Sequence, residues 1–195
     1  MKIGFIGTGL MGFPMAKNLL KKKLYVKVFN RTPKKAKPLE EFGANIKNSL
    51  SETAKDTDII ITMLTDDVAV KNVLEDKNFL NNIKPLTTII DMSSIKPKTA
   101  IEFGKLLKEK NINFLDAPVS GGTIGAEEAS LAIMVGGEKK IFDKVQNILN
   151  IMGNSTLVGP IGSGQVSKLA NQIIVGVTIG AVAEAITLCE KAGVD

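Results

Sequence analysis

Short apolar runs alternate with amphipathic stretches along most of the chain. The runs carry few charges, which is typical of strands buried on both faces of a parallel sheet. Between them, apolar residues recur three or four positions apart, which predicts helices. Predicted strands cover residues 2–6, 25–29, 58–64, 87–92, 113–117, 131–135 and 155–158, and predicted helices cover 10–20, 34–42, 66–74, 97–110 and 139–152. This alternation predicts an α/β fold with a mostly parallel sheet covered by helices on both faces.

The pattern changes after Gly164, where a single long helical segment runs from Gln165 to about Ala192. The segment is rich in Ala, Gly, Ile and Val, so it must bury an apolar stripe against something. Gly, Thr and Glu residues interrupt it between Ile173 and Leu188, so we expect a helix buried in a soluble protein and no span apolar enough to cross a membrane. We also expect the protein to form a homo-oligomer through this helix.

The composition limits which residues can act as acids or bases and which partners the protein can bind. Of the 195 residues, 44% are hydrophobic and 23% are charged, as in a soluble globular protein with its own core. Histidine is absent, so acid–base chemistry must use Lys, Asp, Glu, Cys, Tyr or water. The net charge of +5 comes from scattered lysines without interleaved aromatics, which argues against a nucleic-acid partner. The single cysteine and the lack of a secretory signal favour the cytoplasm, and we predict no metal site.

A glycine pattern, Gly7-Thr-Gly9-Leu10-Met11-Gly12, joins the first predicted strand to the first predicted helix. Gly7 permits the tight turn, Gly9 lets the backbone approach a pyrophosphate, and Gly12 lets the helix pack closely on the strand. The phosphates would lie at the helix N-terminus, where free N–H groups and the helix dipole favour negative charge. In this strand–turn–helix context the pattern indicates a Rossmann-type dinucleotide site, with these glycines, Leu10 and Met11 as candidate cofactor contacts.

The second predicted strand ends at Asn30-Arg31-Thr32, where this fold meets the adenine ribose. An Asp or Glu would bind the ribose 2′-hydroxyl and repel a 2′-phosphate, whereas an arginine suits the phosphate. The sequence therefore favours NADP. NAD stays possible, with Asn30 as its contact and Arg31 as an ordinary surface residue.

Two later segments place polar groups in apolar surroundings. The first, Asp116-Ala-Pro-Val-Ser120-Gly-Gly, follows a predicted strand, and its backbone amides and hydroxyl can cradle a carboxylate; the alternative is a plain loop. In the second, Gly162-Ser-Gly-Gln-Val-Ser-Lys168-Leu-Ala-Asn171-Gln172, the lysine shares a helix face with the two amides. A lysine early in a helix opposes the helix dipole, so Lys168 suits a proton donor better than a structural residue.

In their order along the chain, these motifs resemble those of the β-hydroxyacid dehydrogenase family, and the resemblance covers the whole chain. Its most specific parts are Gly4–Gly12 with Met15–Leu19, Asp116–Gly122, and the glycine pair before Lys168. The family includes 3-hydroxyisobutyrate dehydrogenase, tartronate semialdehyde reductase (2-hydroxy-3-oxopropionate reductase), glyoxylate and succinic semialdehyde reductases and, more distantly, 6-phosphogluconate dehydrogenase. The resemblance implies a Rossmann NAD(P)-binding domain over residues 1–162. Residues 163–195 would be an interdomain helix that starts a truncated, all-helical C-terminal domain.

The resemblance also implies a role for individual residues. Lys168 would be catalytic. The substrate carboxylate and the rest of the substrate would be held by Ser120, Gly121, Gly122, Asn171 and Gln172. The nicotinamide side would be lined by Met63, Leu64 and Ser94. The Asn171-Gln172 form is similar to the tartronate semialdehyde reductase branch, whereas Asn30-Arg31-Thr32 is similar to NADPH-using aldehyde reductases, so the substrate stays open. The segment Glu127–Leu131 departs from the family pattern, which usually has a glycine there.

The implied reaction is reversible hydride transfer between the nicotinamide and the carbonyl carbon of a small carboxylate substrate. Lys168 would protonate the developing alkoxide, or accept the hydroxyl proton in the reverse direction. The alternative function is a non-catalytic dinucleotide-binding module, which the fold alone does not exclude. Lys168 and the Ser120-Gly-Gly segment argue against that module, because a cofactor sensor needs neither.

Overall fold

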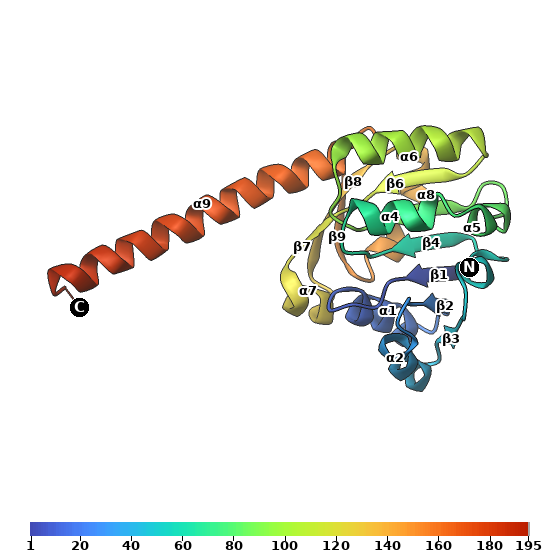
Figure 1. Ribbon diagram of the computed structural model, residues 1–195, viewed down its shortest axis with the longest axis horizontal. Helices are drawn as coiled ribbons and strands as arrows, with labels where there is room; N and C mark the ends of the chain where they lie inside the picture. Colours follow the sequence, from blue (N-terminus) through green and yellow to red (C-terminus); the bar gives the residue numbers. More distant parts are fainter. Residues whose placement is uncertain (195) are drawn as a thin grey trace.

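The computed structural model describes residues 1–194 and has the predicted α/β architecture (Figure 1). The strands are β1 (Lys2–Ile6), β2 (Tyr25–Phe29), β3 (Asn45–Ile46), β4 (Ile59–Thr62), β5 (Thr88–Asp91), β6 (Asn113–Asp116), β7 (Val119–Ser120), β8 (Leu131–Gly136) and β9 (Gly153–Gly159). The helices are α1 (Gly12–Lys21), α2 (Pro33–Ala36), the 3₁₀ helix η1 (Lys37–Phe42), α3 (Leu50–Ala54), α4 (Asp67–Leu74), α5 (Lys77–Asn81), α6 (Pro97–Glu109), α7 (Gly122–Glu128), α8 (Lys139–Leu149) and α9 (Ser163–Ala192).

The first six strands form a parallel sheet in the order β3-β2-β1-β4-β5-β6. This is the strand order of the Rossmann sheet, in which a ligand binds at the carboxyl ends of the strands where the order reverses. Here the reversal lies between β1 and β4. At the far edge, β8 pairs antiparallel with β6 and β7 and parallel with β9.

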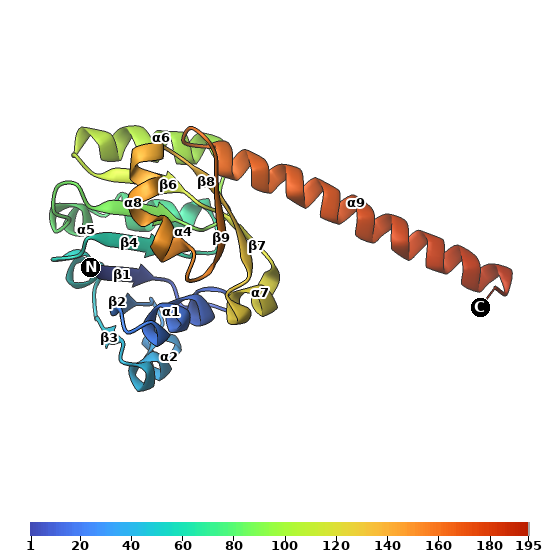
Figure 2. The same cartoon turned by 180° about the vertical axis from the view of Figure 1, so that it is seen from behind.

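The core consists of two apolar clusters, one on each face of the sheet. One cluster contains residues of α1, η1 and α8, and the other contains residues of α4, α5 and α6 (Figures 1 and 2). Successive strand residues point to opposite faces, so Ile59 and Ile61 join one cluster while Ile60 joins the other. The uninterrupted apolar runs of the sequence follow from this burial on both faces.

The structure differs from the predicted pattern in several short segments. The helix predicted over 34–42 divides into α2 and η1, because Pro38 has no N–H to continue an α-helix. The glycine-rich segment after Ser120, for which the pattern predicts no helix, forms α7. The helices α3 and α5 are five residues each, too short for helical periodicity to indicate them.

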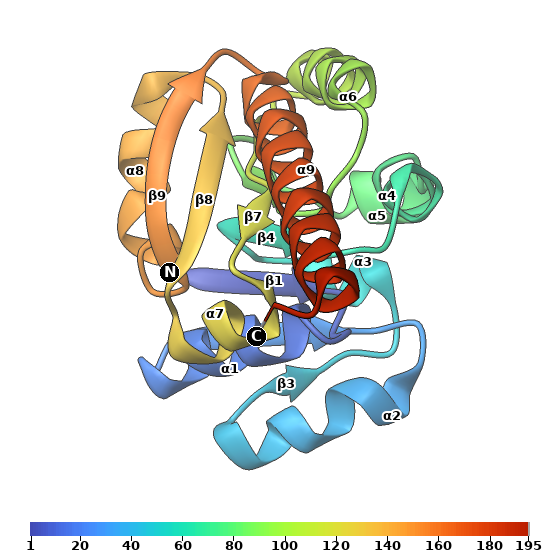
Figure 3. The same cartoon turned by 90° about the vertical axis from the view of Figure 1, so that its left-hand side faces the viewer.

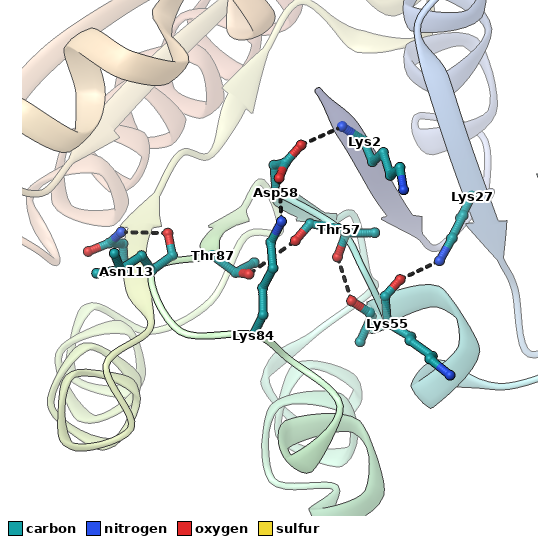
Figure 4. A network of polar contacts seen from close by, with 10 residues as sticks. Lys2, Lys27, Lys55, Thr57, Asp58, Lys84, Thr87 and Asn113 are labelled. Atoms are coloured by element: carbon teal, nitrogen blue, oxygen red, sulfur yellow. Dashed lines mark hydrogen bonds and ion pairs between the residues drawn. The ribbon is translucent and has the colours of Figure 1, made fainter.

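A polar network ties together the amino ends of the strands (Figure 4). The Asp58 carboxylate accepts from the backbone N–H of Lys2 at 2.7 Å and from Lys84 Nζ at 2.5 Å. Buried Thr87 donates its hydroxyl to the carbonyl of Thr57 at 3.1 Å. These bonds link the first residue of β1 to the loops that precede β4 and β5 at this end of the sheet.

The last helix, α9, starts on the sheet and then extends away from it (Figures 1 and 3). From Gln172 to Val194 every described residue is exposed, so along this part the rest of the chain does not cover the apolar stripe. By length and composition, the expectation that no stretch is apolar enough to cross a membrane is wrong, because Ser163–Ala192 is long enough and contains an 18-residue stretch with a mean hydropathy of 1.8. Its glycines and threonines lower the hydropathy too little. Core helices of soluble proteins meet the same criterion.

Candidate functional site

The glycine loop after β1 shows a different steric need at each glycine. Gly7 has a φ of 98°, and a Cβ there would overlap the carbonyl oxygen of Met63. A Cβ at Gly12 would overlap the carbonyl oxygen of Gly7. At Gly9 a Cβ would meet no described atom within 4 Å. Packing within the protein therefore explains Gly7 and Gly12, whereas Gly9 leaves open space that fits the approach of a pyrophosphate.

A pocket of about 350 Å³ opens beside this loop, at the carboxyl ends of β1, β2 and β4. Seven residues predicted from the sequence to contact cofactor line it, namely Gly7, Gly9, Asn30, Arg31, Thr32, Met63 and Leu64. Lys35 lines it too, a basic residue that the sequence argument missed although it follows the Asn-Arg-Thr motif by one helical turn. Arg31 and Lys35 are exposed, so they supply positive charge at the mouth of the pocket.

Asn30 holds the glycine loop. Its Oδ1 accepts from the backbone N–H of Thr8 at 2.9 Å, and its Nδ2 donates to the carbonyl of Thr32 at 2.9 Å. The side chain therefore fixes the loop against the end of β2. The other three glycine-loop candidates lie outside this pocket: Leu10 is exposed in a neighbouring groove of about 610 Å³, Met11 packs half-buried on the core, and Gly12 is buried at the start of α1.

The substrate candidates lie at the end of β7, at the start of α7 and on the first turns of α9, which begins on the sheet and then projects away from it (Figure 3). The Ser120 hydroxyl donates to Asn171 Oδ1 at 3.0 Å, which joins the end of β7 to α9. Lys168 lies one turn before Asn171 and is half-buried; burial lowers its pKa. Gly121 and Gly122 start α7 beside Ser120, with positive φ angles of 136° and 64°. Gln172 and Ser94 are exposed, and the structure shows no hydrogen bond from either side chain among the described residues.

Two buried carboxyl groups stand side by side at this end of the sheet, paired in register on β5 and β6. Burial raises the pKa of Asp91 to about 6, and the neighbouring Asp116 charge adds to this. Burial also raises the pKa of Asp116, although N–H groups at the start of α9 oppose the shift. Asp91 Oδ2 is buried with no hydrogen-bond partner in the described part of the chain. Raised carboxyl pKa values of this kind are common at functional sites.

Comparison with known proteins places the chain among dehydrogenases. Residues 2–162 match the model of the NAD-binding domain of 6-phosphogluconate dehydrogenase, and residues 162–195 match that of the NAD-binding domain of NADP-dependent 3-hydroxyisobutyrate dehydrogenase. The chain is 41% identical to a probable mitochondrial 3-hydroxyisobutyrate dehydrogenase of Dictyostelium discoideum, aligning 99% of the chain with 61% of the relative. It is 43% identical to the 2-hydroxy-3-oxopropionate reductase of Escherichia coli, aligning 100% of the chain with 67% of the relative.

A solved structure agrees with these sequence relatives. The 3-hydroxyisobutyrate dehydrogenase of Mycobacterium tuberculosis, determined with L-serine, superposes with a TM-score of 0.94 at 35% identity. The match covers 100% of this chain and 66% of that one. The chain thus spans roughly two thirds of the length of the proteins it matches. The predicted fold class is confirmed, including the long final helix.

Proposed function

The chain belongs to the β-hydroxyacid dehydrogenase family, and on that premise we propose that it catalyses reversible hydride transfer between NADP(H) and a small β-hydroxyacid or its semialdehyde. One observation carries the proposal. The pocket beside the glycine loop lies at the carboxyl end of the sheet. The half-buried Lys168 and the hydrogen-bonded pair of Ser120 and Asn171 lie at the same end. The names of the relatives at 41% and 43% identity indicate substrates of this class for those proteins.

Each part of the site has a distinct task in this reaction. The residues around the pocket fit a nicotinamide dinucleotide, which supplies the hydride when bound. Lys168 donates a proton to the substrate oxygen as it becomes an alkoxide, and its pKa, lowered by burial, eases that transfer. The Ser120 hydroxyl and the amides of Gly121 and Gly122 hold the carboxylate, so the reacting carbon keeps one orientation.

The test of the reaction is a screen of the purified full chain against small β-hydroxyacids and semialdehydes with both cofactors. Reduction of tartronate, succinic or methylmalonate semialdehyde, abolished by Lys168→Ala, is the expected result. Tight cofactor binding without turnover of any of these substrates would favour the alternative, a non-catalytic dinucleotide-binding module.

The proposed preference for NADPH rests on Arg31 and Lys35 beside the pocket, with no carboxylate among its lining residues. An arginine pairs well with a phosphate through parallel N–H groups. Calorimetry should therefore show tighter binding of NADPH than of NADH, and Arg31→Asp should remove the difference. Lys37→Asp is the matched control, since it makes the same charge change on η1 outside the pocket. Equal affinities in the wild type would refute the preference.

We propose further that the protein forms a homo-oligomer through α9. Ile173, Val177 and Ile179 are each at least 64% exposed, and such a long apolar surface favours association in a protein that stays in solution. Light scattering should show an assembly that Val177→Asp dissociates. A monomer at high concentration, with the wild-type helix intact, would contradict this.

A further inference from the structure

The start of α9 is held from outside the helix. A helix leaves its first N–H groups without partners, and the residue before it commonly supplies a side-chain cap. Here that residue is Gly162, which has no side chain and a φ of 95°. The cap comes instead from Asp116 on β6: its Oδ1 accepts from the N–H of Gly162 at 2.7 Å, and its Oδ2 accepts from the N–H of Gln165 at 2.9 Å.

The fit around this carboxylate is tight. Asp116 is completely buried, and a Cβ at Gly164 would lie 2.8 Å from its Oδ2 and 2.7 Å from its backbone carbonyl oxygen. A Cβ at Gly136 would overlap its Oδ1. Two glycines therefore leave the room that lets the carboxylate reach both N–H groups. The glycine pair before Lys168 thus has a physical cause: Gly162 provides the turn and Gly164 the close approach to β6.

Gln165 makes a second connection, to the loop after β5. It is 1% exposed; its Oε1 accepts from the N–H of Ile95 at 3.1 Å and its Nε2 donates to the carbonyl of Ser93 at 2.8 Å. The Ser93 hydroxyl in turn accepts from the N–H of Leu64 at 2.9 Å. A chain of buried and partly buried hydrogen bonds therefore runs from α9 through the loop after β5 to the loop after β4, which lines the proposed cofactor pocket.

We propose that Asp116 and Gln165 are positioning residues for Lys168, fixing the first turn of α9 to the ends of β5 and β6; the proposal rests on the function proposed above. Lys168 is three residues beyond Gln165, on the next turn of the same helix. The helix also packs against β8, β9 and α6, and Asn171 bonds to Ser120, but the side-chain hydrogen bonds to its first turn come from Asp116 and Gln165. Shifts of about 1 Å in a catalytic group are enough to reduce a rate by about 100-fold.

The test compares two variants with a control in the full chain. Gln165→Met keeps the approximate shape of the side chain and removes both of its bonds, while the Asp116 cap remains. Asp116→Asn leaves one oxygen facing two N–H groups. The control, Thr87→Val, removes a buried hydrogen bond of the amino-end network. Steady-state kinetics, cofactor titration and thermal unfolding are measured on the same samples.

We expect Gln165→Met and Asp116→Asn to lower kcat by about 10- to 100-fold, with the KM for cofactor within about twofold of wild type. The alkaline limb of their kcat profile should move to higher pH, because a looser helix exposes Lys168 and removes the burial that lowers its pKa. Thr87→Val should lose thermal stability and keep its kcat. If Gln165→Met keeps its kcat and pH profile like the control, the positioning role is refuted. If Lys168→Ala itself stays active, the proposed function fails instead, so the two failures are distinct.

Discussion

The amino and carboxyl ends of the parallel strands both carry buried or half-buried polar groups, yet the two sets are in different electrostatic states. At the amino end, hydrogen bonding with Lys84 and with the N–H of Lys2 holds the pKa of Asp58 below its usual value. At the carboxyl end, burial raises the pKa of Asp91 and Asp116 and lowers that of Lys168. The amino end therefore favours the charged form of Asp58, whereas burial at the carboxyl end disfavours the charged forms of its carboxyl groups and of Lys168.

Burial and the Lys84 partner explain the difference, because Asp91 and Asp116 are fully buried whereas Asp58 is partly exposed beside a lysine. The amino-end groups pair with each other across neighbouring loops (Figure 4). The carboxyl end keeps Asp91 Oδ2 and Thr8 Oγ1 buried without partners among the described residues. A closed polar network adds stability, whereas partly satisfied groups cost free energy and are typical of sites where a ligand binds or reacts. The comparison between the two ends of the sheet therefore supports the proposed site at the carboxyl end, and four variants test it.

Lys168→Ala should give the largest effect. Removing a general acid usually lowers a rate by about 10²- to 10⁴-fold, so kcat should fall on that scale while cofactor affinity stays nearly unchanged. Lys168→Arg should not restore the rate, because arginine does not release its proton near neutral pH. The measurement is steady-state kinetics with a cofactor titration. Loss of cofactor affinity without loss of rate would exclude Lys168 as the acid.

Asp91→Asn should change how stability depends on pH. The pKa of Asp91 is about 6 in the folded protein and near 3.8 in the unfolded chain. Between these values the folded state holds more protons, so the stability contribution present below about pH 4 is lost as the pH rises through about 6. The full loss is about 3 kcal/mol at most. Urea unfolding from pH 4 to 8 should show the wild type losing stability relative to the variant. Parallel curves would contradict a raised pKa.

Gly9→Ala separates cofactor binding from stability. Because a Cβ at Gly9 meets no described atom within 4 Å, the variant should unfold at nearly the wild-type temperature. The added methyl group occupies the space proposed for the pyrophosphate, so cofactor affinity should fall by about tenfold or more. Gly12→Ala is the contrasting control, since its Cβ overlaps the Gly7 carbonyl oxygen and stability should fall as well. Unchanged cofactor affinity in Gly9→Ala would show that the pyrophosphate does not bind beside Gly9.

The sequence predicts best what depends on local pattern. The strands β1 and β4 follow from apolar runs, and the glycine loop follows from its place between a strand and a helix. The break at Pro38 and the two-residue strands β3 and β7 depend on tertiary neighbours that periodicity does not contain. The same holds in the site: Asp116 caps a helix 46 residues later, a contact that no spacing in the motif indicates. Local sequence patterns therefore do not predict hydrogen bonds between residues that are far apart in the chain.

Asp58→Asn, which changes the amino end of the sheet, should give the smallest effect, a small loss of stability. The ion pair with Lys84 is 40% exposed at Asp58 and 49% at Lys84, and pairs this exposed contribute less than about 1 kcal/mol. Its pKa is lowered by folding, so its contribution is present at neutral pH and is lost as the pH falls through the folded pKa, opposite in sign to that of Asp91. Urea unfolding at pH 7 should show a small loss that salt reduces, while kcat stays at the wild-type value. A fall in kcat without loss of stability would mean that the amino end also takes part in function.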